Sequence, residues 1–148
     1  MMLHAVMVSG MVLSLYFAIK TRNAYIILIM LGLLIGAGTF LFSSGILQTL
    51  GLILYLGFAA ITGLYALFTN KMTLGARFVL AVMAGLILVY WTWKSFHLPG
   101  SIMFVPMAVI LIQVIAIIRK AELKPVLAFI TLFGTDAFVV LLEEWLKH

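Results

Sequence analysis

Long apolar stretches separated by short polar breaks run through the whole chain. A helix that spans a membrane needs about 20 mainly apolar residues at about 1.5 Å of rise each. Six stretches approach this length: Leu3–Ile19, Ala24–Phe42, Gly45–Phe68, Leu74–Trp93, Ser101–Ile118 and Pro125–Leu146. The pattern therefore predicts an all-α fold, a six-helix transmembrane bundle with short loops, in which residues 1–148 form a single domain.

Two prolines fall within the predicted spans. Pro125 stands at the start of the last span, where its missing N–H is not needed. Pro106 lies inside the fifth span, where it removes a backbone hydrogen bond and predicts a kink that exposes a carbonyl group.

The basic residues divide unevenly between the two ends of the predicted bundle. Only Lys94 and Lys147 fall at the end that holds both termini, and the other seven fall in or beside the first, third and fifth loops: Lys20, Arg22, Lys71, Arg77, Arg119, Lys120 and Lys124. Short cytoplasmic loops concentrate Lys and Arg. The sequence therefore predicts a cell-membrane protein with both termini on the non-cytoplasmic side. The aromatic cluster 90–93 and Trp145 then fall at the outer interface, where such rings anchor.

Composition supports this interpretation. The chain is 66% hydrophobic and 9% charged, whereas charged residues make up about a quarter of a typical soluble protein. The net charge of +5 follows from residues in loops and at helix ends rather than on a basic face with interleaved aromatic rings, so the lipid bilayer and not nucleic acid is the expected partner. The absence of cysteine excludes disulfides and thiolate chemistry.

The two halves of three spans share a weak similarity at an offset of about 75 residues. The segment 5–7 parallels 81–83, and Gly57 parallels Gly134. Because each half holds an odd number of spans, a duplication would give a 3+3 inverted repeat, as in many transporters. Chance similarity between apolar segments is the alternative.

Small residues at helical spacing identify candidate packing faces. Gly32 and Gly36 form a GxxxG pattern in the second span, and Gly57 and Gly63 lie in the third. Such residues let two backbones approach closely in a membrane. We expect these glycines to pack the second span against the third, with a subunit interface or the wall of a substrate path as alternatives.

Asp136 is the most unusual residue of the predicted bundle. It follows Pro125 by 11 residues, or about 16 Å of helix, which places it near the middle of a hydrocarbon core about 30 Å thick. An ionised side chain at that depth costs about 3 kcal/mol on insertion scales, and such acids commonly mark ion or proton routes. No Lys or Arg is predicted at the same depth.

Counting equal depth along the other spans gives candidate neighbours for this acid. Ser9 and Tyr55 are the expected hydrogen-bond partners, and Gln113 lies about a turn deeper on the fifth span. The same helix face continues to Glu143 and Glu144, which extends the acidic side chains toward the outer surface. In the alternative, Asp136 is a neutral structural acid and Glu143 pairs with Lys147.

A second group of residues suits a metal or haem. His4, Met7 and Met11 are spaced i, i+3 and i+7 on one face of the first span, and His97 falls near the same end of the bundle. Imidazole and thioether ligands suit Cu(I), and two histidines can ligate haem. Methionine is also a common filler of apolar cores, so the sequence predicts no cofactor and keeps this site as a distant alternative.

No catalytic motif for hydrolysis or nucleotide use is present, and no enzyme is predicted. Two function classes follow. The first is a transporter or channel for protons, a small cation or a small solute, with ion- or substrate-binding residues Asp136, Tyr55, Ser9 and Gln113. The second is a non-catalytic accessory or assembly subunit of a larger membrane complex, and in either class the partners would be further copies of the chain or other membrane subunits. The polar residues of the spans and the possible duplication favour the first class, and the lack of a gate-like charge pair favours the second. The sequence therefore predicts a transporter or channel, with the accessory subunit as the alternative.

Overall fold

The computed structural model describes residues 2–99, 102–118, 123–124 and 126–146. Within these ranges the chain forms six α-helices: α1 (Met2–Lys20), α2 (Ala24–Phe42), α3 (Ile46–Phe68), α4 (Leu74–Ser95), α5 (Phe104–Ile118) and α6 (Leu127–Leu146). Each helix coincides with one predicted apolar stretch, so the all-α prediction is confirmed.

Among the described residues, four helices, α1 to α4, are long and apolar enough to cross a membrane. Helix α5 has 15 residues and α6 carries three acidic residues, so six crossings and an inverted repeat remain predictions. Large apolar side chains such as Leu28, Ile53 and Phe78 are more than 60% exposed. An exposed apolar surface of this kind together with the apolar helices indicates a membrane protein.

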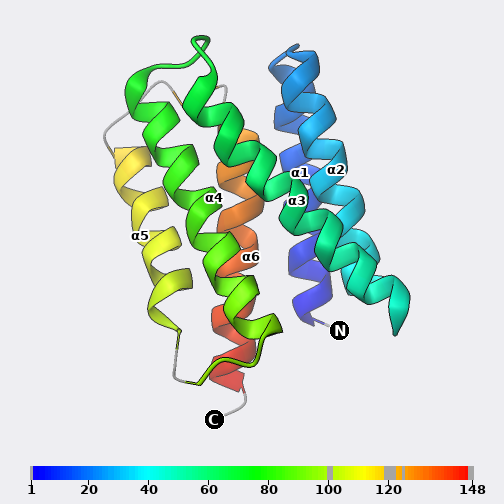
Figure 1. Ribbon diagram of the computed structural model, residues 1–148. Coiled ribbons are helices and arrows are strands. Elements are labelled where there is room, and N and C mark those ends of the chain that lie inside the picture. The colour runs from blue at the N-terminus through cyan, green and yellow to red at the C-terminus, as the bar shows by residue number, and fades with distance from the viewer. Residues whose placement is uncertain (1, 100–101, 119–122, 125, 147–148) are drawn as a thin grey trace.

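Helix α6 occupies an inner position in the bundle. It contacts α1, α4 and α5, while α2 packs along α3 and α3 packs along α4. Successive helices run in opposite directions, so the start of α1 and the end of α6 lie toward the same end of the bundle (Figure 1). Which side of the membrane this end faces remains a prediction.

The helix starts follow from local chemistry. The side chain of Asn23 accepts a hydrogen bond from the Tyr25 backbone N–H at the start of α2, and Thr73 accepts one from Ala76 at the start of α4. Gly45 precedes α3 with a φ of 62°, a conformation that glycine adopts without steric cost.

Arg77 of α4 caps the C-terminal end of α3. Its Nε donates to the Ala66 carbonyl at 3.0 Å, and its NH2 group donates to the Leu67 carbonyl. These carbonyls belong to the last turn of α3, where helix geometry leaves acceptors unpaired and the helix dipole favours a cation. Arg77, which in the sequence indicates only the orientation of the chain in the membrane, therefore also caps a helix.

Pro106 does not kink α5. The helix begins at Phe104, so Pro106 lies in the first turn, where a backbone N–H has no partner within the helix. The predicted kink is wrong because the fifth apolar stretch contains a helix that starts three residues later than expected. Pro125 lies outside the described residues.

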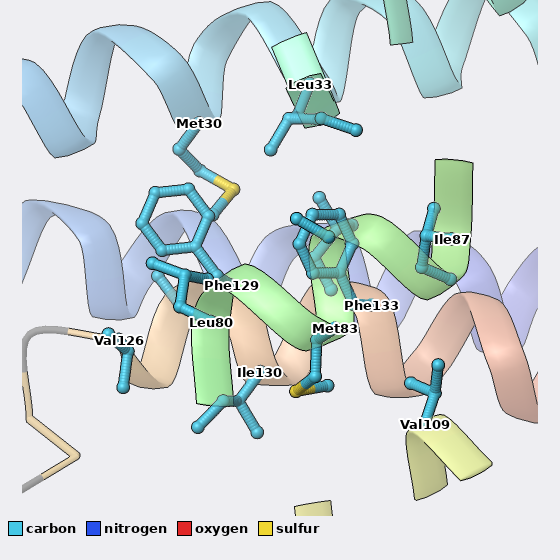
Figure 2. Close-up of a cluster of buried hydrophobic side chains, with 14 of the residues drawn as sticks. Met30, Leu33, Leu80, Met83, Ile87, Val109, Val126, Phe129, Ile130 and Phe133 are labelled. Carbon is cyan, nitrogen blue, oxygen red and sulfur yellow. The ribbon is translucent and has the colours of Figure 1, made fainter. Parts of the chain in front are cut away.

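A cluster of buried apolar side chains fills the bundle around α6 (Figure 2). Phe129 and Phe133 are fully buried and project from α6 toward side chains of α2 and α4 that include Met30, Leu33 and Met83. Nine residues of α6 are buried: Ala128, Phe129, Ile130, Leu132, Phe133, Gly134, Asp136, Ala137 and Val140. The helix that carries Asp136 is thus held inside the bundle.

Two of the four candidate packing glycines join α2 to α3 as predicted. A Cβ at Gly36 would lie 2.5 Å from the backbone nitrogen of Tyr55, and a Cβ at Gly32 would overlap the Phe58 ring. The two helices therefore approach more closely than any larger residue at position 36 would allow.

The other two glycines do not make this contact. Gly57 is exposed, and a Cβ there would meet no atom within 4 Å, so its predicted packing contact is wrong. Gly63 turns instead toward Ala84 of α4, whose Cβ would lie 3.7 Å from a Cβ at this position. Spacing along one helix predicts a shared face but not which neighbour covers it.

Candidate functional site

The carboxylate of Asp136 is buried, with 5% of the residue exposed, and it is held by two donors from two other helices. The Tyr55 hydroxyl of α3 donates to Oδ2 at 2.9 Å, and the indole Nε1 of Trp91 on α4 donates to the same oxygen at 3.0 Å. The site therefore joins α3, α4 and α6. Charge-assisted hydrogen bonds of this kind are the strong ones in proteins.

The hydrogen bond between Tyr55 and Asp136 is the one that equal-depth counting predicts. The close approach of α2 at Gly36 fixes the backbone of α3 at Tyr55, so the tyrosine is placed by packing on its far side. Tyr55 is itself 3% exposed. The hydroxyl is thus held in place rather than free to turn toward another partner.

Ser9 does not join this site. It is exposed, and its hydroxyl donates to the carbonyl of Val6 in its own helix at 2.7 Å. The prediction that Ser9 bonds Asp136 is wrong because depth along a helix says nothing about rotation around its axis. The hydroxyl group of a serine in a membrane helix readily donates its hydrogen bond to a carbonyl of the same helix in this way.

Gln113 also lies away from the carboxylate. Its Nε2 donates to the Ile130 carbonyl at 3.3 Å, and its side chain packs against Gly134. Because Gly134 and Asp136 are two residues apart on α6, they point to nearly opposite faces. Ser9 and Gln113 instead line a different groove, of about 510 Å³, between α1, α5 and α6. The prediction that Gln113 belongs to the Asp136 site is therefore wrong.

Sequence inspection missed Trp91. The sequence predicts the aromatic cluster 90–93 at the outer interface, but Tyr90 and Trp91 are buried, at 4% and 8% exposure, whereas Trp145 is exposed. The spacing of Leu80, Ala84, Ile87 and Trp91 by three and four residues places the tryptophan on the buried face of α4. That periodicity is the signal that could have identified it.

Beside the carboxylate lies a cavity of about 170 Å³. Its wall includes Met7, Phe40, Tyr55, Trp91, Asp136 and Val140. Within the described part of the chain, both hydrogen bonds to Asp136 end on Oδ2, and Oδ1 accepts none. One carboxylate oxygen is thus anchored to the bundle by two donors, and the residue itself lines the cavity.

A charge pair lies at the same cavity, toward the ends of α4 and α6. The Nζ of Lys94 is 3.9 Å from Oε2 of Glu143, and both side chains are about two-fifths exposed. The ammonium also lies over the ring of Trp91, 5.2 Å from its centroid, and over Tyr90 at 5.8 Å. Glu143 therefore contacts Lys94, whereas Lys147, its partner in the alternative interpretation, lies outside the described residues.

The four residues of the alternative metal or haem site are dispersed. Met7 lines the Asp136 cavity, while the His4 ring lies near Phe42 at the end of α2, with 6.1 Å between ring centroids. His97 lines a separate cavity at the end of α4, and Met11 packs at the edge of the core. Among the residues that the structure describes, no group of three or more His, Asp or Glu side chains is placed to hold a metal ion.

Comparison with known proteins finds no relative whose functional residues could be assigned to positions of this chain. No protein-family model matches the chain, and no match was found among curated proteins or solved structures. The function is therefore inferred from the geometry around Asp136.

Proposed function

We propose that the chain is a small multi-pass transporter or channel of the cell membrane in which Asp136 binds a proton or a small cation. The observation that carries this proposal is the position of the carboxylate. It is buried inside the bundle, two donors hold one of its oxygens, and Asp136 lines a cavity that also reaches Lys94 and Glu143.

The chemistry of the site favours a carboxylate that takes up and releases a proton or a cation over one that makes only a fixed structural contact. A buried ionised carboxylate needs hydrogen bonds or a counter-charge, since its desolvation costs several kcal/mol. Tyr55 and Trp91 supply part of this stabilisation at Oδ2. A proton or a cation at Oδ1 supplies the remainder, and the exposed pair at the cavity mouth gives that ion a polar passage to the solvent.

The second candidate is an accessory subunit of a larger membrane complex. The observation in its favour is that the two hydrogen bonds to Asp136 tie three helices together, as a purely structural acid would. The groove that holds Ser9 and Gln113 would then accept a further copy of the chain or another membrane subunit. In this alternative the carboxylate stabilises the bundle and moves nothing.

A flux assay separates the two candidates. The wild type, Asp136→Asn and Gln113→Met are reconstituted in liposomes with a pH-sensitive dye and a potential-sensitive dye, and gel filtration confirms that each variant is folded. Gln113 is the matched control because it is a polar residue of the bundle that faces a different groove. We expect flux in the wild type and in Gln113→Met and loss of most of it in Asp136→Asn.

Equal flux in all three proteins, or no flux above that of empty liposomes with protons and monovalent cations, contradicts the transport proposal. In the second case the accessory role is the better account.

A further inference from the structure

The donor set of the Asp136 cavity is poor in oxygen. Among the described residues that line it, side-chain oxygens come from Tyr55, Asp136 and Glu143 alone, and Glu143 is engaged with Lys94 at the mouth. The remaining wall consists of rings, aliphatic groups and the thioether of Met7. Hard metal cations take about six or more oxygen ligands, so this cavity is a poor site for a bare metal ion.

Aromatic rings in the cavity wall can stabilise a cation where few oxygen ligands are available. Phe40 and Trp91 meet edge to face, with 5.0 Å between their ring centroids, and both line the cavity. A carboxylate and aromatic rings that line one cavity are the combination that recognises organic ammonium ions, because the face of a ring attracts a cation that needs no oxygen shell.

The chain itself places an ammonium group against these rings. The Nζ of Lys94 lies over Trp91 and Tyr90 while its charge is paired with Glu143. Lys94 follows Trp91 by three residues on α4, so it reaches the rings from the mouth side. The rings of Trp91 and Tyr90 therefore already contact one alkylammonium group, that of Lys94, on the mouth side of Asp136.

The charge and the volume of the Asp136 cavity further limit the class of ligand that it can bind. Among the described residues that line the cavity there are two carboxylates and one ammonium, so these three groups together carry a net charge of −1 when all are ionised. Its volume of about 170 Å³ corresponds to roughly five to six water-sized groups at about 30 Å³ each. A monovalent ion of about five non-hydrogen atoms matches both limits.

We propose that the Asp136 cavity binds a small alkylammonium ion, with the positive charge beside Oδ1 of Asp136 and the alkyl groups against Phe40, Trp91 and Met7. This inference rests on the proposed function, because it names the class of cation that the site carries. In the absence of ligand, Lys94 holds the outer part of the same aromatic surface.

Equilibrium binding to the purified full-length protein tests the inference without requiring transport. Tetramethylammonium is titrated while tryptophan fluorescence and heat are recorded, and tert-butanol, a neutral molecule with the same number of non-hydrogen atoms, is the matched ligand control. We expect saturable binding of tetramethylammonium at least about tenfold tighter than that of tert-butanol or sodium ion. The fluorescence change should disappear in Trp91→Phe and persist in Trp145→Phe, since Trp145 is 74% exposed.

Two protein variants complete the test. Asp136→Asn should weaken tetramethylammonium binding by about tenfold or more, because the counter-charge is removed. Trp91→Phe keeps the carboxylate and gives a second test if Asp136→Asn does not fold. Binding of tert-butanol as tight as that of the cation, or unchanged cation binding in a folded Asp136→Asn or Trp91→Phe protein, overturns the inference.

The outcome also separates this inference from the broader proposal. Proton flux that depends on Asp136, combined with no binding of tetramethylammonium, overturns the alkylammonium assignment and leaves the transport proposal intact. Specific binding that depends on Asp136, with no flux of any ion, supports the assignment of the site and contradicts transport.

Discussion

Gly36→Ala tests whether the close approach of α2 and α3 stabilises the bundle. The added Cβ would lie 2.5 Å from the Tyr55 backbone nitrogen and 2.8 Å from its Cα, whereas ordinary contact begins at 3.4 Å. Backbone atoms cannot turn aside, so the two helices must separate by several tenths of an ångström. Forced overpacking of this kind costs about 1–3 kcal/mol.

The control for this substitution is Gly57→Ala on α3. Both changes gain about 1 kcal/mol of helix propensity, but a Cβ at Gly57 meets no atom within 4 Å. Unfolding of both variants in mixed micelles, followed by circular dichroism, therefore isolates the contact. We expect Gly36→Ala to be less stable than Gly57→Ala by about 1–3 kcal/mol. Equal stability of the two proteins would refute the close approach at Gly36.

Three further predictions concern individual side chains. In a double-mutant cycle of Tyr55→Phe and Asp136→Asn, unfolding should show a coupling energy of about 1 kcal/mol, and strictly additive effects would argue against the hydrogen bond. Arg77→Ala should lower the free energy of unfolding by about 1–2 kcal/mol, because it leaves carbonyl groups at the end of α3 unpaired, whereas Lys71→Ala should have a smaller effect. Lys94→Met should change stability by less than about 1 kcal/mol but tighten tetramethylammonium binding in a calorimetric titration, and weaker binding would contradict the competition of Lys94 for the rings.

The helices were predictable because apolar length is a direct physical requirement of the bilayer. Equal-depth counting succeeded for Tyr55 and Asp136, since the rise per residue is constant in every α-helix. The same counting failed for Ser9, which lies at a suitable depth but donates to the Val6 carbonyl of its own helix. Depth follows from the sequence alone, whereas rotation about the helix axis depends on the neighbouring helices.

Residues near the helix ends were harder to assign. An amphipathic ring such as Trp91 is suited both to an interface and to a buried hydrogen bond. Its burial follows from the packing of α4 against α6. The spacing of Leu80, Ala84, Ile87 and Trp91 indicates the buried face of α4 but not which helix covers it. The pair Lys94–Glu143 was missed for the same reason, because its partners are far apart in the sequence and meet only when α4 and α6 pack together.

The central claim is that Asp136 itself takes up the ion in the cavity. Infrared difference spectra of the protein in lipid, recorded with and without tetramethylammonium and over a range of pH, report directly on the carboxyl group. We expect a carboxyl band that changes when the cation is added and that is absent from the difference spectrum of Asp136→Asn. The same difference spectrum in wild type and Asp136→Asn would contradict the claim, because the ion would then act on another group.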